Sequence, residues 1–98
     1  MTAPGLNLEF TGGPGFWRRA KAVPGLPEAC RDAIKMAPPV KGLQAWDLRY
    51  NGKIYGVVLH RSAQRVSFLY VFALPSEEAL FRAKLRELGP VYDALEGP

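Results

Sequence analysis

The sequence contains one cysteine, Cys30, and one histidine, His60, and this scarcity excludes several classes of site. A single cysteine forms neither an intramolecular disulfide nor a thiolate zinc cluster. Nucleophilic catalysis would have to combine His60, inside an expected strand, with Ser62 or Cys30. Cys30 falls on the apolar side of an expected helix, where cysteine is usually a small core residue. We therefore expect no metal and no cofactor.

Long hydrophobic runs are also absent. No apolar stretch approaches the roughly 20 residues of a membrane span, and the N-terminus lacks the charged-then-apolar pattern of a signal peptide. The Gly12-Gly13-Pro14-Gly15 segment lacks the Lys-Ser/Thr pair of a phosphate-binding loop and is expected to be a turn. The 98 residues match a single domain, 1–98, with 1–5 and 96–98 as frayed ends. A cytoplasmic protein without a membrane segment is expected.

Hydrophobic periodicity is clear in the rest of the chain. Residues 6–10 alternate as a short strand does, and 16–23 and 27–37 suit helices, the second with Pro27 at its first turn. Three runs of strand type follow at 46–50, 53–61 and 66–74.

Turn signals separate these runs. Asn51-Gly52 favours a type I′ hairpin, and the link 62–65 closes a second hairpin. In the last run we expect Val66, Phe68, Tyr70 and Phe72 on one face, with apolar residues on the other, so this strand is predicted to be central.

A C-terminal helix is expected after Pro75, with Ser76 as its cap, a break or kink at Gly89-Pro90 and a short final turn. Its apolar seam consists of Phe81, Leu85, Leu88, Tyr92 and Leu95. This spacing suits packing on a sheet or on a partner. The predicted architecture is α+β: a short N-terminal strand, two helices, a three-stranded antiparallel meander and a C-terminal helix.

Basic residues lie next to aromatic residues along the chain, and the formal net charge is +4. Such groups suit phosphate contacts and base stacking. The candidates are Trp17 with Arg18 and Arg19, Arg49 with Tyr50, Lys53 with Tyr55, and His60 with Arg61 and Arg65. Four of them, Arg49, Lys53, Arg61 and Arg65, are expected to converge on one rim of the sheet, although a solvated sheet edge has the same composition.

The segment Val40-Lys41-Gly42-Leu43-Gln44-Ala45-Trp46-Asp47-Leu48-Arg49, followed by Tyr55-Gly56-Val57-Val58-Leu59 and Leu69-Tyr70-Val71-Phe72, resembles the RelE/HigB superfamily of small bacterial and phage toxins. The resemblance covers roughly residues 8–88 and is carried mainly by the middle third. It implies a RelE-like fold, an mRNA or ribosome target, neutralisation by a small antitoxin, and endoribonuclease activity.

Within this resemblance, Arg49 and Tyr55 match family positions and, with Arg61, form the candidate catalytic set. Arg18, Arg19, Lys53 and Arg65 are the candidate nucleic-acid contacts. The chain departs from the family at Gly56, where an arginine is expected, and at Ala73 and Leu74, where lysines are expected. Losing cations from a site that stabilises developing charge weakens catalysis.

A second hypothesis is therefore a non-catalytic interaction protein. It would bind another protein through the seam residues Phe81, Leu85, Leu88 and Tyr92, or through an exposed sheet edge. The residues at positions 56, 73 and 74 favour this hypothesis, because they lack the expected cations.

Overall fold

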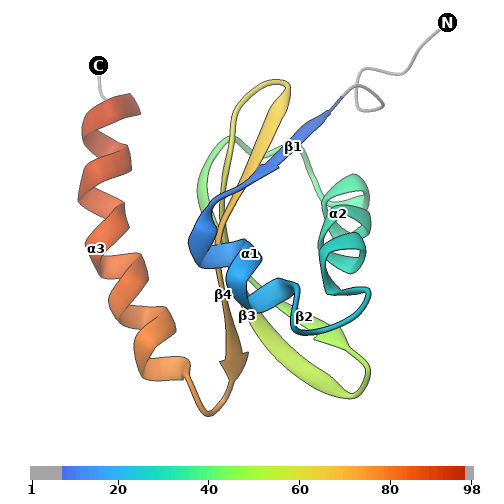
Figure 1. Ribbon diagram of the computed structural model, residues 1–98. Coiled ribbons are helices and arrows are strands. Elements are labelled where there is room, and N and C mark those ends of the chain that lie inside the picture. Colours follow the sequence, from blue (N-terminus) through green and yellow to red (C-terminus); the bar gives the residue numbers. More distant parts are fainter. Residues whose placement is uncertain (1–7, 97–98) are drawn as a thin grey trace, which may run out of the picture.

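The computed structural model describes residues 8–96, which form a four-stranded sheet with helices on both faces (Figure 1). The elements are β1 (Glu9–Gly12), α1 (Pro14–Ala20), α2 (Leu26–Met36), β2 (Gly42–Tyr50), β3 (Lys53–Arg61), β4 (Arg65–Leu74) and α3 (Glu78–Glu96). The α+β class and the expected order of elements are confirmed. The expected frayed ends lie outside the described residues, apart from Glu96, which ends α3.

The strands are arranged in the order β1-β4-β3-β2. As expected, β2, β3 and β4 form an antiparallel meander and β4 is central. β1 pairs with β4 in parallel, with Glu9 opposite Arg65 and Gly12 opposite Phe68. This strand lies further along the chain than the expected 6–10, of which 6 and 7 are outside the described residues. The sheet is therefore mixed.

Both hairpins form where the turn signals predict them. Asn51 and Gly52 have φ angles of 51° and 76°, the positive values that a type I′ turn requires. At the other hairpin, the amide of Ser62 donates to the carbonyl oxygen of Arg65 at 2.9 Å. The two turns lie at opposite ends of β3, because one precedes this strand and the other follows it.

Each face of the sheet has its own core. On one face, α1 and α2 bury Phe16, Leu26 and Ile34 against strand residues such as Val57 and Leu59. On the other face, α3 packs Phe81 against Val58 and Phe72, and Leu85 and Leu88 are partly buried there. Figure 1 shows α3 on the opposite side of the sheet from α1 and α2.

A register shift in the β3–β4 pair changes which β4 side chains share a face. Val58 is opposite Tyr70, but the next residue, Leu59, is opposite Phe68, so Leu69 is extra. Before the shift, Phe68 faces α1 and α2, and after it Tyr70 faces α3. The expected alignment of Val66, Phe68, Tyr70 and Phe72 on one face is wrong, because such a bulge reverses the alternation of side chains.

Of the break or kink expected at Gly89-Pro90, the break is wrong, since α3 continues through both residues to Glu96. Contacts on both sides of Pro90 hold the helix against the sheet. Leu88 packs against the second core, and the Tyr92 ring stacks on His60 at a centroid distance of 4.8 Å. The Ser76 hydroxyl donates to the carbonyl oxygen of Ala73 instead of capping the helix, which begins at Glu78. Within 8–96, no helix is long and apolar enough to span a membrane.

Candidate functional site

The three candidate catalytic residues do not converge on one point of the sheet. Arg49 is exposed on β2, opposite Ile54 of β3, and therefore on the α3 face near the Asn51-Gly52 turn. Tyr55, the next residue of β3, points to the other face and is only 8% exposed. Arg61 is on the same face as Tyr55 but at the far end of β3. It lies about 23 Å from Ile54, the residue opposite Arg49, because each strand residue spans roughly 3.3 Å.

The expectation that the four hairpin cations converge on one rim is therefore wrong. Arg49 and Lys53 flank the turn at one end of the sheet, and Arg61 and Arg65 lie at the other end. The sequence gives their positions relative to the turns, but adjacent hairpins place their turns at opposite ends of the shared strand. Two pairs of cations result, and no single cluster of four.

Arg61 is a buried cation. The residue is 6% exposed, and its Nη1 atom has no hydrogen-bond partner within the described part of the chain. No ion pair is formed between Arg61 and any acidic side chain of the described chain. Such a group is not accessible to the phosphates of a polymer, so the structure provides no support for a catalytic role of Arg61.

Gly56, at the position of a family arginine, faces α3. A Cβ atom at this position would lie 3.0 Å from three atoms of the Phe81 ring. The ring therefore occupies the space that a larger side chain would need. The glycine allows the close approach of α3 to the sheet, and a Cβ at this position would require the Phe81 ring to shift by a few tenths of an ångström.

The candidate nucleic-acid contact Arg19 is engaged within the protein. Its guanidinium forms hydrogen bonds to both carboxylate oxygens of Glu77 and lies 5.6 Å from the centroid of the Phe72 ring. The Glu77 carboxylate also accepts the amide of Ala73 at 2.8 Å. The hydrogen bonds from Arg19 and Ala73 hold the pKa of Glu77 below its usual value, and Glu77 raises the pKa of Arg19.

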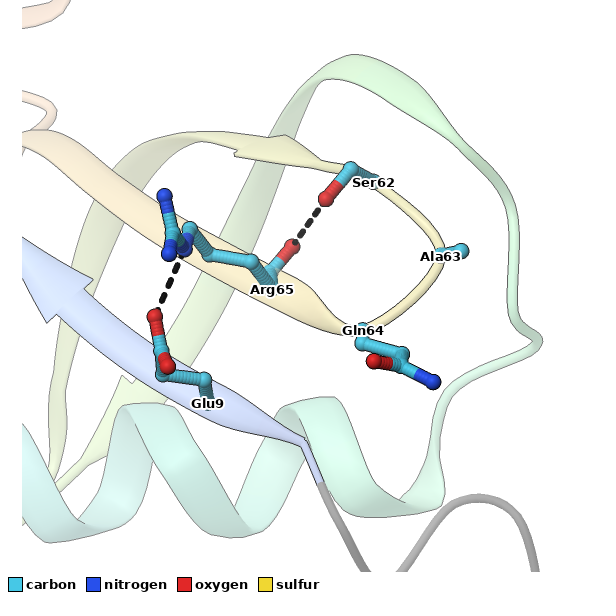
Figure 2. A pocket seen from close by; sticks show the side chains of 5 residues that line it. All are labelled: Glu9, Ser62, Ala63, Gln64 and Arg65. Carbon is cyan, nitrogen blue, oxygen red and sulfur yellow. Dashed lines mark hydrogen bonds and ion pairs between the residues drawn. The ribbon is translucent and has the colours of Figure 1, made fainter.

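Arg65, another candidate contact, is paired as well. A recess of about 420 Å³ lies at the β3–β4 turn. Figure 2 shows the residues that line it, among which Arg65 Nε donates to Glu9 Oε1 at 2.7 Å. The Ser62 hydroxyl lies 3.4 Å from the carbonyl oxygen of Arg65. The one cation in this recess is neutralised by the one carboxylate, which leaves no net charge to attract a ligand.

Not every cation of the protein is paired with a carboxylate. Of the 13 Lys and Arg residues, Arg19, Arg65, Arg82 and Lys84 form ion pairs in the described structure. Arg18, Arg49 and Lys53 are exposed, and none of them has an acidic partner among residues 8–96. These three are the sequence-predicted residues that remain accessible to an anionic partner.

A second recess, of about 290 Å³, lies between β1, α1 and α2. Phe10, Phe16, Trp17 and Phe68 contribute aromatic rings to its walls, and Arg31 of α2 is its only charged residue. The sequence singled out Trp17 but missed the others, because Phe10, Phe68 and Arg31 come from three separate segments. A period-2 pattern in β1 and β4 was the only signal for Phe10 and Phe68, and no pattern marked Arg31.

The cysteine thiol and the possible metal ligands are the remaining candidate groups. Burial raises the pKa of Cys30 to about 11, which keeps the thiol protonated at neutral pH. Among residues 8–96, no group of three or more His, Cys, Asp or Glu side chains could hold a metal ion.

Four of the five seam residues of α3 face the sheet, whereas the fifth, Leu95, is 75% exposed. Phe81 is 9% exposed, Leu85 and Leu88 are partly buried in the second core, and Tyr92 stacks on His60. Of the two uses that its spacing allows, packing on the sheet is the one observed. Binding a partner through these residues would require α3 to leave the sheet.

Comparisons with known protein families, curated proteins and solved structures found no match to this chain. The resemblance to the RelE/HigB superfamily therefore rests on the quoted motifs alone. What the chain binds has to be argued from its own side chains.

Proposed function

We propose that this protein binds single-stranded RNA, as free mRNA or on the ribosome, in the manner of a RelE/HigB-like protein, and that it does not cleave the RNA. The observation that carries the proposal is the division of its cations into two groups. Four are neutralised by carboxylates, whereas Arg18, Arg49 and Lys53 are exposed without an acidic partner in the described structure. Exposed unpaired cations are what a phosphate backbone binds.

Binding without cleavage follows from the separation of the candidate catalytic residues. Transition-state stabilisation requires donors aimed at one reacting group. Arg49 and Tyr55 are on opposite faces of the sheet, and Arg61 is buried at the other end of β3. A cytoplasmic location and a small antitoxin as partner are further parts of the same proposal.

The test is RNA affinity as a function of salt concentration. For single strands, the slope of log K against log salt falls by about 0.7 for each phosphate that a cation no longer neutralises. We expect the double variant Arg49→Ala/Lys53→Ala to bind more weakly and with a smaller slope.

The matched control is Arg65→Ala/Arg82→Ala, which removes the same formal charge from two cations that are ion-paired in the structure. It should retain most of the affinity and the slope. Equal reductions in the two double variants would show that only net charge matters. No RNA binding by the folded wild-type protein would refute the proposal.

One observation favours the interaction-protein alternative. β2 is an edge strand of nine residues, so one side of its backbone has no partner strand within the sheet. An exposed edge of this kind accepts an added strand from another chain. Binding of that kind would depend little on salt and would be insensitive to the Arg49→Ala/Lys53→Ala change.

A further inference from the structure

We propose that the recess between β1, α1 and α2 is a nucleotide site, in which a base stacks on aromatic rings and its phosphate binds Arg31. The proposal rests on the proposed RNA-binding function and adds to it the place where one base is held. The site has three parts, namely a set of aromatic rings, an accessible recess beside them and one unpaired cation.

The rings come from three elements. Phe68 of β4 stacks on Phe10 of β1 with a centroid distance of 6.1 Å and an interplanar angle of 6°. On Phe16 of α1 it stacks at 4.9 Å and 20°. The indole of Trp17 meets Phe16 edge to face, at 5.4 Å and 76°. Phe16 and Phe68 are buried, whereas Phe10 and Trp17 are half-buried, so part of each outer residue remains accessible.

Gly12 positions the indole. A Cβ atom at Gly12 would lie 2.5 Å from Nε1 of Trp17, so only a glycine allows the indole to lie this close to β1. Trp17 is thus held at the edge of the recess by the backbone of the strand. An aromatic residue fixed in this way loses little side-chain entropy when a ring stacks on it.

Arg31 supplies the charge. It is half-buried, and it forms no ion pair with any acidic side chain of the described residues. A lone guanidinium beside aromatic rings fits a ligand that combines a flat ring with an anionic group, because guanidinium binds phosphate through two parallel hydrogen bonds. The volume, about 290 Å³, is at the lower limit of small-molecule sites and suits one nucleotide.

The experiment uses the emission of Trp17, isolated by the substitution Trp46→Phe, since the chain has two tryptophans. The probes are adenosine monophosphate, ribose 5-phosphate and an oligoadenylate. We expect adenosine monophosphate and the oligoadenylate to change the emission of Trp17, and ribose 5-phosphate, which has no base, to have little effect. Arg31→Gln should weaken binding of both active probes about ten-fold or more, the decrease expected when a hydrogen bond between a guanidinium and a phosphate is lost.

The matched control is Lys35→Gln, since Lys35 is exposed one turn further along α2 and does not line the recess. It should change the affinity less than two-fold. A second variant, Phe10→Leu, removes a ring and keeps an apolar residue. If Phe10→Leu fails to fold, Arg31→Gln still tests the site.

The outcomes separate this inference from the proposed function. If the oligoadenylate binds but Arg31→Gln and Lys35→Gln have equal effects, the nucleotide site is refuted and RNA binding stands. If adenosine monophosphate binds through Arg31 but the oligoadenylate binds no more tightly, the site stands and the RNA-binding function fails. Absence of any change in Trp17 emission with all three probes refutes the site.

Discussion

Replacing Arg61 by methionine should stabilise the protein. Arg61 is 6% exposed, and its Nη1 has no hydrogen-bond partner among residues 8–96. In proteins, a buried polar group without a partner costs about 1–3 kcal/mol, and more when it is charged. Replacing buried ion pairs with apolar residues of similar volume is often neutral or stabilising by about 1–4 kcal/mol. Methionine keeps an unbranched apolar stem in place of the arginine stem and removes the buried charge.

We therefore expect Arg61→Met to raise the free energy of unfolding by about 1–3 kcal/mol. For a domain of this size, each kcal/mol raises the midpoint of thermal unfolding by about 4–8 °C. Urea unfolding followed by tryptophan fluorescence measures the free energy, and calorimetry measures the midpoint. The control is Lys53→Met, which changes the same charge at an exposed site and should stay within about 0.5 kcal/mol of the wild type.

A decrease in stability in Arg61→Met would refute this reasoning. It would mean that the guanidinium contributes more through packing or through an anionic partner than its burial costs. RNA affinity gives a second check, since Arg61→Met should bind RNA no more weakly than Lys53→Met does. A selective decrease in RNA binding in Arg61→Met would return Arg61 to the functional site.

Three further changes test the packing and the charges. The Arg19 guanidinium holds the pKa of Glu77 below its usual value of 4.5, so the stabilisation is present above about this pH and is lost as the pH falls through the lowered pKa. Urea unfolding across this range should show that Glu77→Gln is less stable than the wild type at neutral pH and loses less on acidification; equal acid sensitivity would contradict this. Gly56→Ala should lower the free energy of unfolding by about 1–3 kcal/mol, because the new methyl group meets the Phe81 ring. The decrease should be smaller in a Phe81→Leu background, which a double-mutant cycle measured by urea unfolding tests. Additive effects of the two substitutions would show that the ring is not the cause. Because burial raises the pKa of Cys30 to about 11, a thiol reagent at neutral pH should label it only as fast as the protein opens, and rapid labelling of the native protein would contradict its burial.

The sequence predicted the elements well because each is marked locally. Asn51-Gly52 has the residues that positive φ angles need, and Pro27 suits the first turn of α2. The direction of β1 was not predictable in this way, since its pairing with β4 joins residues 56 positions apart. The extra residue at Leu69 had no local signal either, because every residue around it is apolar.

The candidate site was predicted less well, and the reason is geometric. A cation near a turn can be recognised in the sequence, but its partner depends on the tertiary fold. Arg19 meets Glu77 across 58 positions, and Arg65 meets Glu9 across 56. Arg31 was not singled out, because no aromatic residue is its neighbour in sequence.

The parallel pairing of β1 with β4 has a consequence for synthesis on the ribosome. β1 leaves the ribosome before its hydrogen-bonding partner, the segment from Arg65 to Phe68, which follows more than fifty residues later. Until then the rings of Phe10 and Phe16 lack Phe68, on which both stack in the folded protein. Contacts this distant in sequence slow folding. The nascent chain therefore holds these rings without their stacking partner until Phe68 has emerged, and apolar surface exposed in this way during folding is prone to aggregation.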